Sequence, residues 1–245
     1  MKALRSSAVR PHLVACGLLV FFGLAPLALC TAAIAQHSDR GAPIVPDLAR
    51  IADGQAWRVI NGEFQFSNDK EGRPTVRLAP IGGNRQGSNL ALALVRGVAF
   101  EQGEIEVDLR GNAAGQASFL GVAFAVTEGH AHEAIYFRPF NFQAENPVQR
   151  AHAVQYVAWP QHPWDRLRAE HPGVYESAVA PGPDPVAWFH VRVEVSAARV
   201  NVFVNEATQP CLSVDRLGGS ATGDVGLWVD SQPGSFANLK IRRLP

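Results

Sequence analysis

Apolar and polar residues alternate over short runs along most of the chain after residue 57. Because strand side chains point alternately to the two faces of a sheet, this period of two is typical of β-strands with one buried face. Gly, Pro, Asn and Asp separate the runs, as expected for turns. The pattern predicts strands at 63–66, 75–79, 89–95, 103–110, 118–126, 134–140, 152–159, 188–195, 199–205, 224–230 and 235–243.

So many short strands, with almost no helical period between them, indicate an all-β fold in which antiparallel strands form a sandwich or a barrel. One short helix is predicted at 163–170, where Pro163 suits the helix start and Gly173 follows its end. We find no internal repeat. The pattern therefore predicts one β domain over residues 55–245.

The first residues have a different character. Three basic residues precede an apolar run at 13–29, and Ala-Ile-Ala follows at 33–35. This order predicts a secretory signal peptide over residues 1–35, and therefore a secreted or periplasmic protein. The next segment, 36–54, is rich in Pro and charge, and we expect it to be flexible.

Removal of the predicted signal peptide changes the charge and the cysteine content. The whole chain has 22 basic and 22 acidic residues, and loss of Lys2, Arg5 and Arg10 leaves 19 basic residues and a net charge near −3. Such a chain does not attract nucleic acid. Cys211 alone remains, so no internal disulfide is expected, and no second apolar run is long enough to span a membrane.

One predicted strand, 103–110, carries a row of acids on one face. Its apolar residues share the other face, so the acids that lie together are Glu104, Glu106 and Asp108. Glycoside hydrolysis uses two carboxylates about 5–5.5 Å apart in retaining enzymes and about 6.5–9.5 Å apart in inverting ones. Residues two apart on a strand are separated by roughly 6.6–6.8 Å. This spacing permits a catalytic role, and the alternative is an ordinary solvated strand face.

Aromatic and polar residues gather between 133 and 176. Sugars present flat apolar faces and rims of hydroxyls, so their sites need aromatic platforms with polar groups at the edges. Tyr136, Arg138 and Phe140 share one strand face, and Pro139 ends the ladder there. The predicted ligand-binding residues are Glu133, Tyr136, Arg138, Asn141, His152, Gln155, Tyr156, Trp159 and Trp164.

The alternative for this segment is a second small core beneath the predicted helix. Arg138 favours a cleft, because a buried arginine needs a partner whereas one that faces a groove can bind a ligand. His130, His132 and Glu133 are potential metal ligands but lack the helical zinc pattern, and we interpret them as a solvent-facing loop. No metal or other cofactor is predicted.

The order of several motifs resembles a known superfamily. These motifs are WRVINGE at 57–63, GEIEVDL, GVAFAV, WFHVRVEV followed by RVNVFVN, and GDVGLWVD followed by SFANLKI. Together they resemble the concanavalin A-like lectins and glucanases, and within them the 3-keto-disaccharide hydrolase-like domain, a laminin-G-like jelly roll. The resemblance covers about residues 55–243.

This resemblance implies a jelly-roll sandwich of two curved antiparallel sheets, with carbohydrate bound on the concave face. Retaining glucanases of the superfamily carry Glu, Asp and Glu at alternate positions of one concave strand, and 104–108 resembles this with the residue types exchanged. Some laminin-G-like modules bind calcium, for which Asp224 and Asp230 are weak candidates. Residues 130–176 form an insertion relative to the family pattern, so no catalytic residue is carried over there.

Two functional hypotheses follow. The first is an exported enzyme that hydrolyses a glycoside, including a 3-keto-glycoside, with the acids of 104–108 and the 133–176 segment in one cleft. The second is a lectin-like module that binds glycan without catalysis. A structural or protein-binding sandwich is a third alternative, because the fold serves many functions.

Overall fold

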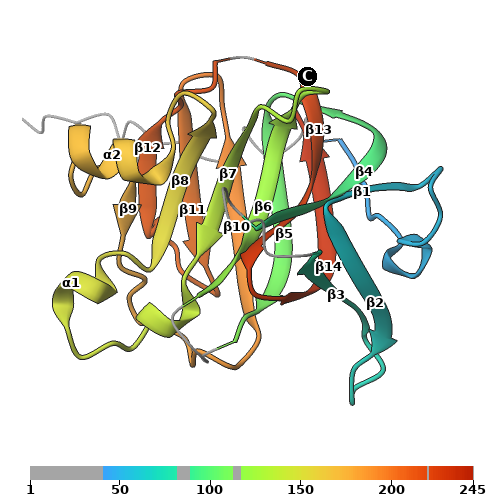
Figure 1. Cartoon of the computed structure of the whole chain (residues 1–245), viewed down its shortest axis with the longest axis horizontal. Coiled ribbons are helices and arrows are strands. Elements are labelled where there is room, and N and C mark those ends of the chain that lie inside the picture. Colours follow the sequence, from blue (N-terminus) through green and yellow to red (C-terminus); the bar gives the residue numbers. More distant parts are fainter. Residues whose placement is uncertain (1–40, 82–88, 113–116, 220, 245) are drawn as a thin grey trace, which may run out of the picture. The chain divides into compact units, whose positions relative to one another are not determined.

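The computed structural model describes residues 41–81, 89–112, 117–219 and 221–244. Within these ranges, antiparallel strands form two seven-stranded sheets, and the helices are few and short (Figure 1). The predicted all-β jelly-roll sandwich is confirmed. The predicted signal peptide, residues 1–35, lies outside the described residues. In the described part of the chain, no helix is both long and apolar enough to cross a membrane.

We call the two layers sheet A and sheet B. The strand order of sheet A is β12 (Leu212–Asp215), β11 (Arg199–Val204), β10 (Phe189–Val195), β5 (Gly103–Arg110), β14 (Gly234–Arg243), β3 (Pro74–Pro80) and β2 (Gly62–Asn68). The order of sheet B is β1 (Trp57–Ile60), β4 (Leu90–Phe100), β13 (Gly223–Ser231), β6 (Ser118–Val126), β7 (His132–Phe137), β8 (Val154–Trp159) and β9 (Glu176–Ser177). Each of the eleven segments predicted as strands overlaps one of these strands.

The core lies between the sheets and follows the predicted alternation. Ile105, Val107 and Leu109 of β5 are fully buried, whereas the acids between them lie on the opposite face. Phe137 of β7 meets Phe189 of β10 edge to face, with ring centroids 5.3 Å apart, which joins sheet B to sheet A. Each sheet therefore has one face in the core and an outer face that is available for function.

The inserted segment builds the end of sheet B at β7, β8 and β9. Between β7 and β8 the chain forms the 3-10 turn η3 (Pro139–Asn141) and the one-turn helix α1 (Pro147–Arg150). After β8 comes helix α2 (Trp164–Glu170), close to the predicted 163–170, which lies beside β8 (Figure 1). Its Leu167 is buried. The strand predicted at 134–140 ends at Phe137, because the proline at 139 cannot continue the ladder.

The prediction of a flexible segment over 36–54 is wrong for its described part. Ile44 forms two backbone hydrogen bonds with Ile241 of β14, both 2.8 Å long. The 3-10 turn η1 (Leu48–Arg50) follows, and its Leu48 is buried in the core together with Ile51. The apolar residues of this segment therefore attach it to the sandwich despite its polar composition.

Candidate functional site

The outer face of sheet B holds a cavity of about 500 Å³, which we call the sheet B cavity. Strands β4, β6, β7, β8 and β13 contribute to it, together with η3 and helix α2. Its volume lies in the range of small-molecule sites. The cavity is lined by Leu90, Phe119, Tyr136, Arg138, Phe140, Asn141, His152, Trp159, Trp164, Asp165, Arg168, Trp228, Asp230 and Ser231.

Two stacked aromatic rings form part of the wall. Trp228 of β13 and Tyr136 of β7 both pair with Gly121 of β6, which lies between them. Because Gly121 has no side chain, the two rings meet above it, with centroids 4.7 Å apart and planes inclined by 16°. Phe119, two residues earlier on β6, packs edge to face on Tyr136. The wall is therefore a continuous aromatic surface.

A buried histidine lies at the edge of the Trp228 ring. The indole Nε1–H of Trp228 donates to Nε2 of His132 at 3.4 Å, and Nδ1 of His132 lies 2.8 Å from the carbonyl oxygen of His130. Burial lowers the pKa of His132, which favours the neutral ring with its proton on Nδ1. Neutral His132 thus helps to fix the orientation of Trp228.

Arg138 lies beside the aromatic wall and is only 6% exposed. Its Nη1 donates to the carbonyl oxygen of His152 at 2.8 Å, and its Nη2 donates to the hydroxyl of Tyr136 at 2.9 Å. A longer contact of 3.4 Å joins Nη2 to Oε1 of Gln155. The guanidinium carbon lies 5.0 Å from the centroid of the Tyr136 ring. Arg138 and Tyr136 therefore fix each other's position. Burial raises the pKa of Tyr136 to about 12, so its hydroxyl keeps its proton.

Helix α2 forms one rim of the cavity. Trp164 is 44% exposed, and its ring lies 5.0 Å from the guanidinium carbon of Arg168. Arg168 donates to both carboxylate oxygens of Glu176, at 2.9 and 2.6 Å. Nδ1 of His152 lies 2.8 Å from the same carboxylate. Glu176 is therefore the counter-charge of Arg168 and also lies next to His152.

Two carboxylates also line the cavity, Asp165 at the start of α2 and Asp230 on β13. Asp230 accepts a hydrogen bond of 2.7 Å from the hydroxyl of Ser231. Burial raises the pKa of Asp230, and the hydrogen bond from Ser231 opposes this only in part. Asp230 is therefore the carboxylate of this cavity whose proton is held more strongly than usual.

The structure brings six of the nine predicted ligand-binding residues to this cavity. They are Tyr136, Arg138, Asn141, His152, Trp159 and Trp164. Gln155 lies on the same face of sheet B but is 1% exposed, and its amide Nε2 donates to the carbonyl oxygen of Tyr175 at 3.0 Å. Gln155 does not line the cavity, and its Oε1 contacts Nη2 of Arg138.

The other two, Glu133 and Tyr156, lie on the core face of sheet B. The hydroxyl of Tyr156 donates to Oε2 of Glu133 at 2.6 Å, and Nη2 of Arg216 lies 2.8 Å from Oε1 of Glu133. All three side chains are buried. The interpretation of Glu133 and Tyr156 as ligand-binding residues is therefore wrong, because they form an internal polar network.

The predicted catalytic acids lie on the opposite layer. Glu104, Glu106 and Asp108 are on the outer face of β5, in sheet A. The hypothesis that these acids share one cleft with the 133–176 segment is therefore wrong. Sequence alternation assigns each group to a strand face but does not determine which sheet contains the strand.

Basic side chains on the neighbouring strands pair with this row of acids. Oδ1 of Asp108 lies 2.8 Å from His190 on β10, and its Oδ2 accepts from Arg73 at 2.9 Å and from Asn238 at 2.7 Å. Burial alone would raise the pKa of Asp108, but these hydrogen bonds and the nearby charges of His190 and Arg73 lower it. A proton-donating acid needs the opposite shift.

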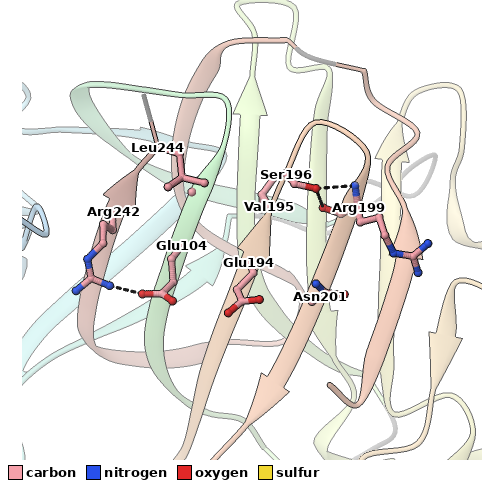
Figure 2. A pocket seen from close by; sticks show the side chains of 9 residues that line it. Glu104, Glu194, Val195, Ser196, Arg199, Asn201, Arg242 and Leu244 are labelled. Atoms are coloured by element: carbon pink, nitrogen blue, oxygen red, sulfur yellow. Dashed lines mark hydrogen bonds and ion pairs between the residues drawn. The ribbon is translucent and has the colours of Figure 1, made fainter. Parts of the chain in front are cut away.

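The other two acids of β5 are paired in the same way. Lys240 of β14 lies 3.6 Å from Glu106, and Arg242 of the same strand forms an ion pair with Glu104 (Figure 2). The adjacent hollow has a volume of about 180 Å³ and includes Glu194, whose carboxylate pairs with Arg192. This face is therefore an array of cross-strand ion pairs, which is closer to the solvated-face alternative than to a catalytic pair.

The interpretation of His130, His132 and Glu133 as a solvent-facing loop holds only for His130. The other two residues begin β7 and are buried. Across residues 41–81, 89–112, 117–219 and 221–244, no group of three or more His, Cys, Asp or Glu side chains is placed to hold a metal ion.

Trp228 is absent from the predicted ligand site, and Asp230 is predicted only as a candidate calcium ligand. They alternate with Leu227 and Val229, which point into the core. This alternation places them on the outer face, so the signal was present. Phe119 of β6 likewise alternates with the buried Leu120. Trp228, a large aromatic residue on the polar face of the central strand β13, was the sequence feature from which the site could have been predicted.

Comparison with protein-family models finds no match, and neither does comparison with curated proteins. Among solved structures, a protein of unknown function with a galectin-like fold from Bacillus subtilis is similar with a TM-score of 0.51 at 13% identity, over 83% of this chain and 96% of that chain. The fold is a galectin-like jelly roll. This likeness agrees with the two antiparallel sheets of the sandwich.

Two further structures are similar at lower scores. The carbohydrate-binding module CBM66 from Bacillus subtilis has a TM-score of 0.49 at 14% identity, over 76% of this chain and 96% of that chain. A β-glucanase from Bacillus licheniformis has a TM-score of 0.49 at 11% identity, over 84% of this chain and 99% of that chain. At such identities the likeness concerns the fold alone.

Proposed function

We propose that this protein binds a carbohydrate in the sheet B cavity. The observation that carries the proposal is the stacked pair of Tyr136 and Trp228 beside Arg138, on one wall of a cavity of about 500 Å³. The C–H face of a sugar ring packs well on such an aromatic surface, while its hydroxyls need donors and acceptors around the rim. Asn141, His152 and the two aspartates supply these polar groups.

Export remains part of the proposal. It is based on the signal-peptide pattern of residues 1–35, which supports a secreted or periplasmic location. A glycan-binding protein in that location would meet extracellular or cell-wall carbohydrate.

A second candidate function is hydrolysis of the bound glycoside, including a 3-keto-glycoside, in the same cavity. Asp230 favours it, because a general acid needs a raised pKa, and Asp165 is a second carboxylate on the cavity wall. The row of acids on β5 does not support this candidate. Measurement of reducing sugar released during binding experiments separates hydrolysis from binding alone.

Trp164→Ala is expected to weaken glycan binding about tenfold, because loss of one stacking aromatic at a binding site costs at least about 1 kcal/mol. Trp164 is 44% exposed, so the variant should remain folded. The measurement is calorimetric titration of the mature chain with a panel of oligosaccharides.

Trp188→Ala is the matched control. Trp188 lies on the sheet A side of the sandwich, where its ring stacks with Arg73 and Arg110. This variant should keep the affinity of the unmodified protein within about twofold. An equal loss of affinity in both variants, or a loss in the Trp188 variant alone, would place the binding site elsewhere.

A further inference from the structure

The guanidinium of Arg138, in the sheet B cavity, has no paired carboxylate among the residues that the structure describes. Each hydrogen bond of its guanidinium goes to a neutral acceptor: a backbone carbonyl, a tyrosine hydroxyl and an amide oxygen. Within the described ranges, no carboxylate forms an ion pair with it, and Glu176, which pairs with Arg168, acts on it only as a more distant charge. A buried arginine without a counter-charge is unusual, because the cost of its desolvation is not offset.

Two other arginines of the same sheet region show the usual arrangement. Arg216, whose side chain is fully buried, pairs with Glu133 at 2.8 Å. Arg168 pairs with Glu176 through two hydrogen bonds. The fold thus pairs each of these cations with a carboxylate. Arg138, which is only 6% exposed, has no such pair in the described parts of the chain.

The guanidinium keeps capacity for a ligand. Of its five N–H groups, three are used in the contacts with His152, Tyr136 and Gln155, and one of these is long at 3.4 Å. The Nε–H and one N–H of Nη1 have no acceptor among the residues described. Because Arg138 lines the cavity, an incoming anionic group could accept hydrogen bonds from it.

The acidic groups of the cavity do not cancel this charge. Asp230 accepts a hydrogen bond from Ser231, and burial raises its pKa, but it forms no ion pair with Arg138. Asp165 belongs to the exposed helix α2 at the rim. Glu176 is already shared by Arg168 and His152. The position next to Arg138 therefore has a positive charge with no directly paired carboxylate from the described residues, and Glu176, already paired with Arg168, offsets it only from a distance.

We propose that the bound carbohydrate carries a carboxylate, as a uronic acid residue does, and that Arg138 binds this carboxylate. The inference depends on the proposed function, since it specifies the class of sugar for the same cavity. The sugar ring would pack on the exposed ring of Trp164 against the aromatic wall, and its carboxylate would provide a directly paired counter-charge for Arg138. The partner is thus an acidic glycan.

The test compares oligouronides with the same oligosaccharides after chemical reduction of their carboxyl groups to alcohols. These pairs share linkage and ring geometry and differ only in charge. Calorimetric titration of the unmodified protein should show at least tenfold tighter binding of one oligouronide than of its reduced form. In Arg138→Gln this ratio should fall below about twofold, and in Arg138→Lys, which keeps the charge, part of the preference should remain.

The outcomes separate the inference from the proposed function. Equal binding of an oligouronide and its reduced form would overturn the inference and leave carbohydrate binding intact. Tighter binding of a sulfated than of a carboxylated glycan would also overturn it. Absence of binding to any saccharide would overturn both. The ratio in the unmodified protein decides the question even if Arg138 variants fail to fold.

Discussion

Glu133→Ala is expected to destabilise the fold by about 3–5 kcal/mol, because removal of one member of a buried ion pair leaves the other charge without a partner. The side chain of Arg216 is fully buried against Glu133, and Tyr156 donates its hydroxyl hydrogen to the same carboxylate. Both groups would lose their acceptor in the interior. Urea unfolding measures the loss as a lower midpoint at an unchanged slope.

The double variant Glu133→Leu with Arg216→Met is the control for this prediction. It removes both charges and keeps side-chain volume, so it should recover a large part of the lost stability. If Glu133→Ala unfolded within about 1 kcal/mol of the unmodified protein, Glu133 would not be the internal anchor that the contacts indicate. Its earlier interpretation as a ligand-binding residue would then regain support.

Gly121→Ala is expected to cost about 1–3 kcal/mol of stability and to disturb the cavity wall at the same time. A Cβ atom at this position would lie 2.0 Å from the carbonyl oxygen of Ile135 and 2.7 Å from Cα of Tyr136. Both are backbone atoms of β7, so strand β6 or β7 must move and lose ladder hydrogen bonds. The stacked rings of Tyr136 and Trp228 would separate with them.

Gly129→Ala is the matched substitution, because a Cβ there meets no atom within 4 Å. Its stability should stay within about 0.5 kcal/mol of the unmodified protein. Thermal unfolding followed by near-ultraviolet circular dichroism would report both the stability and the environment of the aromatic pair. Equal stability of the two variants would contradict the close approach of β6 and β7 at Gly121.

Much of the fold was accessible from the sequence because its strands alternate regularly. The period of two identified the core residues Ile105, Val107 and Leu109 and the strands that carry them. The short strand β9 (Glu176–Ser177) escaped, since two residues cannot show a period. The segment around Leu48 also escaped, because its two buried residues lie among prolines and charges.

The site was predictable only in part. Six of the residues predicted to bind ligand line one cavity, because they are close in sequence and β7 and β8 are adjacent. Glu133 was misassigned although alternation groups it with Ile135 and Phe137 on the core face. The separation of the β5 acids from this cavity could not be derived, because the assignment of strands to two sheets depends on long-range pairing.

The most direct measurement of the central claim, that the outer face of sheet B is the ligand site, uses the tryptophan side chains as reporters. The chain has five tryptophans, so five indole N–H signals are expected in a two-dimensional nitrogen–proton spectrum. Trp159, Trp164 and Trp228 line the sheet B cavity. Trp188 stacks on Arg73, which binds Asp108 of the acidic row on sheet A.

Titration with an oligosaccharide that binds should shift the signals of Trp159, Trp164 and Trp228 and leave those of Trp188 and Trp57 in place. Each signal is assigned by a single tryptophan-to-phenylalanine variant. A shift of the Trp188 signal without change at the three cavity tryptophans would contradict the account, and would place the ligand on the acidic face of β5 instead.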